Sequence, residues 1–323
     1  MNPKSPNPSL SSLGRRNLLL SAGTLVGGLA CATAPQLRSA EKTSTQAKAF
    51  TFCLNTSTIR GQNLTIAEEI DVAAKAGYDA IEPWFRKISA YTEKGGSLKD
   101  LRKRIDDHGL QVPSSIGFAK WIVDDDKVRA AGLEEAKRDM DTIAQLGGTR
   151  LAAPPVGATK EAGLDLRKAG ERYRALLELG DEMGIVPQVE VWGFSKNLNR
   201  LCDSTSVAIA ADHPKACILS DVYHLYKGGS AFEGLRLLGP QSLQVIHMND
   251  YPDIPRAKIG DADRVFTGDG IAPLQQVFDI FKNIGAQPVL SLELFNREYW
   301  KMDAYDCAKE GLDKLKASVA KYA

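Results

Sequence analysis

Four residues that can bind a metal ion lie at or near the ends of four consecutive predicted strands. They are Glu190, Asp221, His247 and Glu293. A carboxylate in an apolar strand loses hydration, so it needs a cation or hydrogen bonds around it. Carboxylates that converge also repel one another unless a divalent ion lies between them. The four residues therefore predict one shared metal site. The alternative is that each is satisfied separately by a local arginine, lysine or backbone group.

The types of these side chains indicate which metal ions the site would take. Three carboxylates and one imidazole form a hard, mixed ligand set, which favours Mn²⁺ first, with Mg²⁺, Co²⁺ and Zn²⁺ as alternatives. Two more polar residues are expected near the same place, where they could contact a bound molecule. Glu82 ends another predicted strand, and His224 lies three residues after Asp221. For His224 the alternative is a histidine packed within a loop.

The elements that must position these residues alternate between strand-like and helix-like stretches from Phe50 to the C-terminus. The predicted strands span residues 50–55, 79–82, 110–116, 149–153, 185–191, 216–221, 243–247 and 288–294. The predicted helices span residues 65–76, 98–108, 128–146, 162–183, 197–211, 232–238, 273–283 and 303–321. Eight βα units predict a single-domain (β/α)₈ TIM barrel over residues 50–323, with its active site at the carboxyl ends of the strands.

The competing fold is an open, doubly wound parallel sheet. That fold normally has a glycine-rich, phosphate-binding turn after its first strand. Residues 56–61 follow the first predicted strand here, and their sequence, Thr-Ser-Thr-Ile-Arg-Gly, lacks such a turn. The sequence therefore favours the barrel.

Residues 1–34 have the features of an export signal. Arg15 and Arg16 precede an apolar stretch, and a paired arginine indicates the twin-arginine route to the periplasm. One alternative is a membrane anchor, although the apolar stretch is short for a span. Another is a lipid attached at Cys31. Residues 35–49 are expected to form a disordered linker, and no stable membrane span is expected after processing.

The charge balance gives no support for nucleic acid or an anionic membrane as a partner. The 323 residues carry a formal net charge of +1, without a strongly basic excess. We therefore expect a small-molecule substrate, and the sequence leaves a homo-oligomer open.

In its strand-end motifs the chain resembles the xylose-isomerase-like barrel superfamily, in particular its sugar phosphate isomerase/epimerase branch. That branch includes ketose 3-epimerases and inosose dehydratases. The similarity runs from about Phe50 to the C-terminus and is strongest in five motifs. They are Val-Glu190-Val, Ser-Asp221-Val-Tyr-His224, Ile-His247-Met-Asn-Asp250, Gly268-Asp269-Gly270-Ile271 and Leu-Glu293-Leu.

The resemblance implies roles for individual residues. In that family the metal ligands are the residues that match Glu190, Asp221, His247 and Glu293. The two glutamates also act as an acid–base pair on either face of the substrate. The histidine matching His224 contacts a substrate oxygen, and Arg264 is the candidate for an arginine that often assists. Ketose epimerases usually carry a substrate-contacting glutamate where this chain has Lys196. This departure argues against a simple ketose 3-epimerase and leaves Lys196 as the candidate for that contact.

The resulting hypothesis is a metal-dependent isomerase or epimerase that acts on a free sugar or keto-sugar through an enediolate. Glu190 and Glu293 would be its acid–base pair. The same residues would also suit a lyase or dehydratase that acts on an inosose or 3-keto-glycoside. Export favours a substrate without phosphate, because sugar phosphates are scarce outside the cytoplasm. Two alternatives from other classes are a non-catalytic periplasmic sugar-binding barrel and a metal-dependent phosphodiesterase.

Several aromatic residues lie near the predicted strand ends. They are Trp84, Phe85, Trp121, Trp192 and Phe295. Such residues could form an apolar wall that stacks on a sugar ring, with Trp192 closest in sequence to the predicted ligands. The alternative is that they pack in the core.

Overall fold

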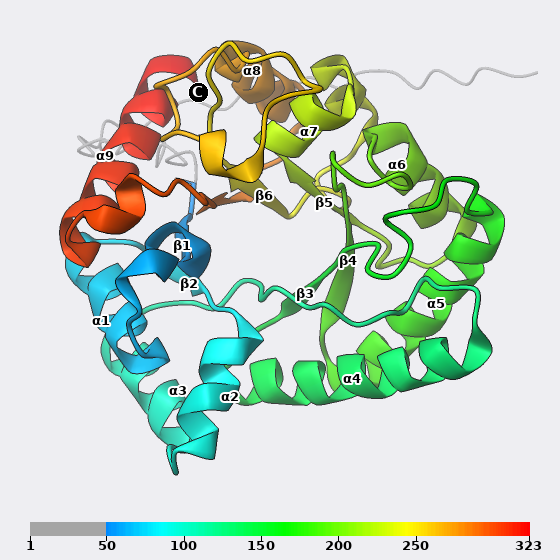
Figure 1. Ribbon diagram of the computed structural model, residues 1–323, viewed down its shortest axis with the longest axis horizontal. Coiled ribbons are helices and arrows are strands. Elements are labelled where there is room, and N and C mark those ends of the chain that lie inside the picture. The colour runs from blue at the N-terminus through cyan, green and yellow to red at the C-terminus, as the bar shows by residue number, and fades with distance from the viewer. Residues whose placement is uncertain (1–49) are drawn as a thin grey trace, which may run out of the picture. The chain divides into compact units, whose positions relative to one another are not determined.

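Seven parallel strands form one curled sheet in the computed structural model, which describes residues 50–323 (Figure 1). The strands are β1 (Phe52–Asn55), β2 (Ala80–Glu82), β3 (Arg150–Ala153), β4 (Val186–Glu190), β5 (Ile218–Asp221), β6 (Val245–Met248) and β7 (Val289–Leu292). Their order in the sheet is β2-β1-β7-β6-β5-β4-β3, and all neighbouring pairs are parallel. Parallel pairing brings the carboxyl ends of the strands to one end of the barrel.

The segment between β2 and β3 closes the sheet into the predicted TIM barrel. The sequence predicts a strand over residues 110–116, but the structure has only single bridges there, which join the segment to Ala80 of β2 and to Ala152 of β3. Pro113 lies in the middle of this segment and has no backbone N–H, so it cannot continue a hydrogen-bonded ladder. The prediction of a continuous strand over residues 110–116 is therefore wrong, although this segment occupies the place of a strand in the barrel.

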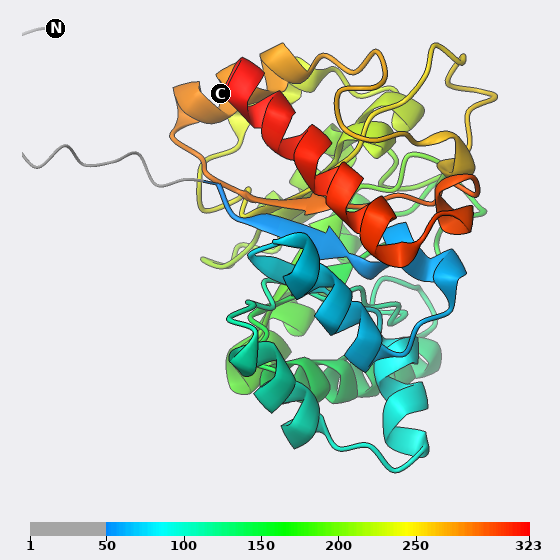
Figure 2. The ribbon, with the colours of Figure 1, turned by 90° about the vertical axis from the view of Figure 1, so that its left-hand side faces the viewer.

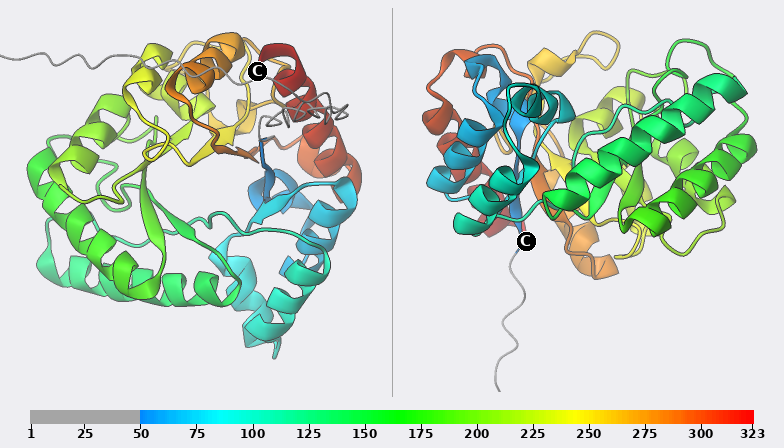
Figure 3. Two further views of the ribbon diagram at one scale, coloured as in Figure 1. Left: turned by 180° about the vertical axis from the view of Figure 1, so that it is seen from behind. Right: turned by 90° about the horizontal axis from the view of Figure 1, so that it is seen from below.

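Helices cover the outer face of the sheet (Figures 2 and 3). The α-helices are α1 (Ile66–Ala76), α2 (Phe85–Glu93), α3 (Leu98–Asp107), α4 (Asp126–Gln145), α5 (Leu166–Met183), α6 (Leu201–Ala210), α7 (Val222–Gly228), α8 (Leu274–Ile284) and α9 (Ala304–Tyr322). The 3₁₀ helices are η1 (Thr56–Gln62), η2 (Phe232–Leu237), η3 (Asp261–Asp263) and η4 (Tyr299–Lys301). The sequence did not predict α2 and α7, and the helix predicted over residues 232–238 is the 3₁₀ helix η2.

A small apolar cluster lies inside the barrel, separate from the main core. Its members are Ile116, Ala152, Leu219 and Val245. Leu219 and Val245 precede Asp221 and His247 by two residues, so they share the same face of their strands. The interior below the strand ends is therefore apolar, and the polar side chains gather above it.

The export signal predicted over residues 1–34 and the linker predicted over residues 35–49 lie outside the described residues. Within residues 50–323, none of the helices has the length and apolar character needed to cross a membrane. The first strand of the barrel, β1, begins at Phe52, close to the start of the described part.

Glu69 in α1 is a buried carboxyl group beside Lys87. Its side chain is 1% exposed, and Lys87 Nζ of α2 lies 3.7 Å from its Oε1 atom. Burial raises the pKa of Glu69 to about 7, and the charge of Lys87 opposes part of this shift. The folded chain therefore holds the Glu69 proton more tightly than the unfolded chain does. As a result, the free energy of unfolding falls as the pH rises from about 4.5 through about 7.

We predict that Glu69→Gln removes this pH-dependent loss of stability. The stability advantage of the variant over the wild type should grow by roughly 2 kcal/mol between pH 5 and pH 8. Urea unfolding at both pH values measures this difference. Glu93→Gln, which changes an exposed glutamate of α2, serves as the control. Its free energy of unfolding should differ from that of the wild type by the same amount at both pH values. A Glu69→Gln effect of equal size at both pH values would contradict the prediction.

Candidate metal centre

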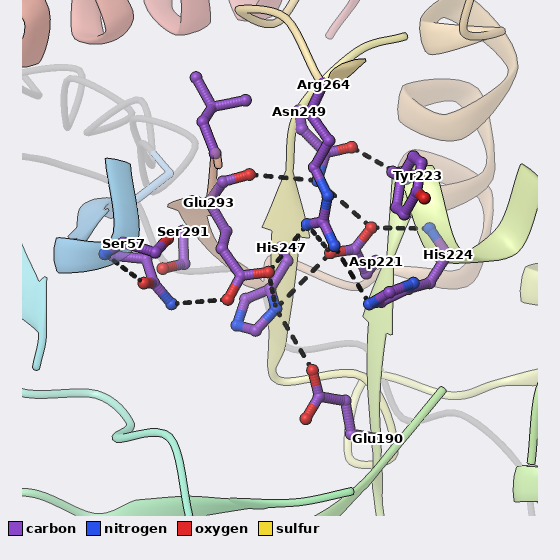
Figure 4. A network of polar contacts seen from close by, with 12 residues as sticks. Ser57, Glu190, Asp221, Tyr223, His224, His247, Asn249, Arg264, Ser291 and Glu293 are labelled. Carbon is purple, nitrogen blue, oxygen red and sulfur yellow. Dashed lines mark hydrogen bonds and ion pairs between the residues drawn. The ribbon is translucent and has the colours of Figure 1, made fainter. Parts of the chain in front are cut away.

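The four predicted ligands converge at the carboxyl ends of the neighbouring strands β4 to β7 (Figure 4). Glu190 and Asp221 are the last residues of β4 and β5, and Asp221 is in register with His247 of β6. Glu293 follows directly after β7. Each of the four residues is at most 3% exposed. The parallel register therefore gathers three carboxylates and one imidazole at the buried mouth of the barrel.

His247 lies at the centre of this group. Its Nδ1 atom is 3.3 Å from Glu293 Oε2, 3.7 Å from Asp221 Oδ2 and 3.8 Å from Glu190 Oε1. One ligand atom from each of Asp221, His247 and Glu293 lies within 4.8 Å of the others. Among the described residues, neither His247 Nδ1 nor Glu190 Oε2 has a hydrogen-bond partner, although both are buried. A buried, unpartnered imidazole nitrogen that faces carboxylates fits a divalent cation.

The other ring nitrogen of His247 contacts Glu82, the last residue of β2. The Nε2 atom lies 3.1 Å from Glu82 Oε2, which also accepts hydrogen bonds from Ser291 Oγ at 2.7 Å and Asn55 Nδ2 at 2.9 Å. Glu82 is fully buried and is absent from the cavity lining. This carboxylate therefore orients the imidazole from below, so that Nε2 carries the proton and Nδ1 faces the carboxylates.

Arg264 supplies a positive charge to the same group. Its Nη1 atom donates to Asp221 Oδ2 and to Glu293 Oε2, both at 2.9 Å. Its Nη2 atom donates to Asp261 Oδ1 at 2.7 Å and lies 3.1 Å from His224 Nε2. The side chain of Arg264 is 1% exposed, so its charge is balanced by these carboxylates rather than by solvent.

The carboxyl groups of the centre differ in their tendency to ionise. Burial, together with the nearby Glu293 charge, raises the pKa of Glu190 to about 8, against the lowering effect of His247. Burial also acts to raise the pKa of Asp221, but the charge of Arg264 outweighs it, and the pKa falls to about 2. Asp221 is therefore the fixed anion of the group.

The two histidines of the centre shift in opposite directions. Burial alone would lower the pKa of His247, but the charges of Glu293 and Glu82 raise it well above its usual value. Burial lowers the pKa of His224, although Asp221 opposes the shift. His224 is therefore the neutral imidazole of the site, placed beside Arg264.

A cavity of about 180 Å³ opens in front of these groups. Its polar lining consists of Glu190, His224, Asp261, Arg264 and Glu293. Its aromatic lining consists of Trp84, Phe118, Trp192, Phe194 and Phe295. The cavity thus joins ionisable groups to a largely aromatic wall, as sites for small molecules do.

Some residues singled out in the sequence lie elsewhere. Lys196 is exposed and is absent from the cavity lining, and Phe85 begins α2 outside it. Trp121 is buried in the core, where its Nε1 atom donates to Pro154 O at 3.0 Å. Core packing was the alternative for these aromatic residues, and it applies to Trp121.

Other residues of the site were not predicted from the sequence. Phe118 and Phe194 line the cavity from loops, and their only sequence signal is that each follows a strand-like stretch by a few residues. Asn249 donates from Nδ2 to Asp221 Oδ1 at 3.2 Å, and Asn55 donates from Nδ2 to Glu293 Oε1 at 3.2 Å. Both asparagines lie in or just after strands, where a neutral polar residue gives no clear functional signal.

Comparison with known sequences gives a family match over most of the chain. The family model for the xylose isomerase-like TIM barrel matches residues 70–318. The inosose isomerase of Bacillus velezensis is 26% identical over 274 residues, which cover 84% of this chain and 97% of that protein. The inosose isomerase of Bacillus subtilis is 25% identical over 279 residues, which cover 84% of this chain and 98% of that protein.

Comparison with solved structures gives the same fold. The crystal structure of the IOLI protein with a binding zinc atom has a TM-score of 0.78 and 24% identity, and the match covers 84% of this chain and 99% of that chain. The crystal structure of D-psicose 3-epimerase in the presence of D-fructose has a TM-score of 0.67 and 19% identity, and the match covers 81% of this chain and 97% of that chain.

We predict that Glu82→Gln lowers the affinity for Mn²⁺ by about 10- to 100-fold, because the imidazole of His247 loses the carboxylate that orients it. Isothermal titration of chelator-treated protein with Mn²⁺ measures this affinity. Glu69→Gln changes another buried glutamate outside the centre, so it should bind Mn²⁺ as the wild type does. Unchanged affinity in Glu82→Gln would show that His247 does not depend on this contact.

Proposed function

Because the chain belongs to the family of xylose isomerase-like TIM barrels, we propose that it is a metal-dependent isomerase or epimerase that acts on a free sugar or keto-sugar. Its relatives named inosose isomerase and its structural neighbour D-psicose 3-epimerase support an enzyme that modifies sugars. The observation that carries the proposal is the pair of glutamates, Glu190 and Glu293, that line one cavity on either side of His247.

Asp221, His247 and Glu293, with Glu190 beside them, would hold one divalent cation, for which we propose Mn²⁺. When bound, such a cation polarises a carbonyl oxygen of the sugar and stabilises the negative charge that develops as a proton leaves carbon. The zinc atom in the structure of the IOLI protein supports a divalent ion in this chain and keeps Zn²⁺ among the alternatives, with Mg²⁺ and Co²⁺.

We assign the first proton transfer to Glu190 in its ionised form, whose share grows as the pH rises toward the pKa of about 8. Its Oε2 atom has no hydrogen-bond partner among the described residues, whereas both carboxylate oxygens of Glu293 accept hydrogen bonds, one from Asn55 and one from Arg264. Glu293, carrying a proton taken up from solvent, then donates it to the sugar, and Glu190 afterwards releases the abstracted proton to solvent. Return to the opposite face of the same carbon gives an epimer, and return to the adjacent carbon gives an isomer.

His224 and Arg264 are proposed to bind an oxygen atom of the substrate. Gly193 N donates to His224 Nδ1 at 3.2 Å, while Arg264 Nη2, also a donor, lies beside His224 Nε2. A neutral imidazole can accept at only one ring nitrogen. With Nδ1 as the acceptor, Nε2 carries a proton and faces another donor. A hydroxyl or carbonyl oxygen that entered between them would accept from both.

The charge of the cavity favours a substrate without phosphate. Among the residues that line it, Arg264 is the only cation, and Asp221, Asp261 and Glu293 already neutralise it. A phosphate would therefore enter beside carboxylates, because Arg60, whose guanidinium stacks on Trp84 and Phe295, does not line the cavity. We also propose that residues 1–34 direct export by the twin-arginine route, which would place the enzyme in the periplasm with free sugars as substrates.

We predict that the protein with Mn²⁺ exchanges a carbon-bound proton of its substrate with D₂O. NMR of free ketohexoses and inososes incubated in D₂O measures this exchange and identifies the products. Glu190→Gln and Glu293→Gln should each slow the exchange by about 100-fold or more, because each removes one proton carrier.

Glu134→Gln, which changes an exposed glutamate of α4, is the control variant and should exchange at the wild-type rate. An absence of exchange for all these sugars with Mn²⁺, Co²⁺ and Zn²⁺ would contradict the enzyme and favour a sugar-binding barrel. A β-elimination product would move the assignment to the lyase alternative.

A further inference from the structure

Three aromatic rings form a strip along one wall of the cavity, from Phe118 through Trp192 to Phe194. The ring centroid of Trp192 lies 6.2 Å from that of Phe118 and 5.1 Å from that of Phe194. All three side chains line the cavity. Three rings at these separations offer more apolar stacking surface than one face of a six-membered sugar ring covers.

The ends of this strip are open to solvent. Phe118 is 38% exposed and Phe194 is 47% exposed, whereas Trp192 between them is half-buried. Among the large hydrophobic side chains that are exposed within residues 50–323, these two are the aromatic ones. Exposed aromatic surface that continues into a cavity is typical of a binding site rather than of a folded core.

The polar groups line the same cavity, and the ring centroid of His224 lies 5.7 Å from that of Phe194. Glu190, His224, Arg264 and Glu293 surround its floor, beside the candidate metal ligands. The volume of the whole cavity, about 180 Å³, is below the range of about 300–1,000 Å³ for drug-sized ligands, so the cavity accommodates a single sugar ring. A sugar bound there would leave the solvent-exposed parts of Phe118 and Phe194 uncovered.

We propose that Phe118 and Phe194 bind a second ring of the substrate, joined to the sugar that reacts at the floor. The substrate class is then a keto-glycoside: its keto group allows the proposed proton transfer, and its second ring, either an aryl group or another sugar, has a flat apolar face. This inference rests on the proposed function for the identity of the first ring. Aromatic side chains stack on aryl rings, and the C–H faces of sugars offer a similar apolar surface.

Titration calorimetry with paired glycosides tests the proposal separately from catalysis. The probes are the methyl and 4-nitrophenyl β-glycosides of glucose, galactose and mannose, which have no free carbonyl group and so cannot undergo the proposed proton transfer. In at least one pair, the 4-nitrophenyl glycoside should bind about tenfold more tightly than the methyl glycoside. The double variant Phe118→Ala/Phe194→Ala should reduce that ratio to within about threefold.

Methyl β-cellobioside in the same titration distinguishes the two kinds of second ring. If this disaccharide binds more tightly than the methyl glucoside, the second ring is a sugar. If only the nitrophenyl compounds bind more tightly than their methyl partners, the second ring is an aryl group. Either result supports the proposal. Ile209→Ala and Leu237→Ala change exposed apolar residues that do not line the cavity, so they should leave the ratio unchanged.

Equal affinities within every pair, including no binding by either member, would overturn the proposal, as would a ratio that survives in the double variant. Failure of the exchange reaction in D₂O would contradict the proposed enzymatic function. It would not affect a measured preference for two-ring ligands. The two failures are therefore distinguishable.

Discussion

The burial of several carboxylates around one imidazole is the constraint on which the site depends. A buried carboxylate that lacks a cation or hydrogen bonds is strongly disfavoured. Arg264 relieves part of this cost, because it donates to both Asp221 and Glu293 at 2.9 Å. His247 Nδ1 and Glu190 Oε2 still have no partner among the described residues. One divalent cation held by Asp221, His247 and Glu293 would satisfy His247 Nδ1 and would offset the charge of the carboxylates around it.

The architecture explains why these groups can be buried together. Asp221 and His247 are paired in register in parallel strands, so their side chains leave the sheet at the same level. The apolar cluster beneath them, which includes Leu219 and Val245, fills the interior of the barrel. Rigid strands and a packed interior therefore hold the ligands in place, while the loops beyond the strand ends supply the aromatic wall.

The sequence allows the barrel and the four candidate ligands to be predicted, because each depends on local patterns. Strand-like stretches alternate with helices, and ionisable residues stand where four of the strands end. Contacts between residues on opposite sides of the barrel could not be predicted, because local sequence patterns do not show which distant residues meet. Glu82 was expected beside the substrate, but its partner is His247, which is 165 residues away along the chain. Pro113 breaks a stretch that otherwise has the length of a strand, and the loop positions of Phe118 and Phe194 follow no periodic pattern.

Anomalous diffraction from crystals of the Mn²⁺-loaded protein tests the central claim most directly. The account predicts one strong manganese peak at the mouth of the barrel, bound by His247 Nδ1 and by carboxylate oxygens of Asp221 and Glu293, with Glu190 beside it. A well-ordered structure in which manganese lies elsewhere, or in which these side chains bind no metal at saturating Mn²⁺, would contradict it.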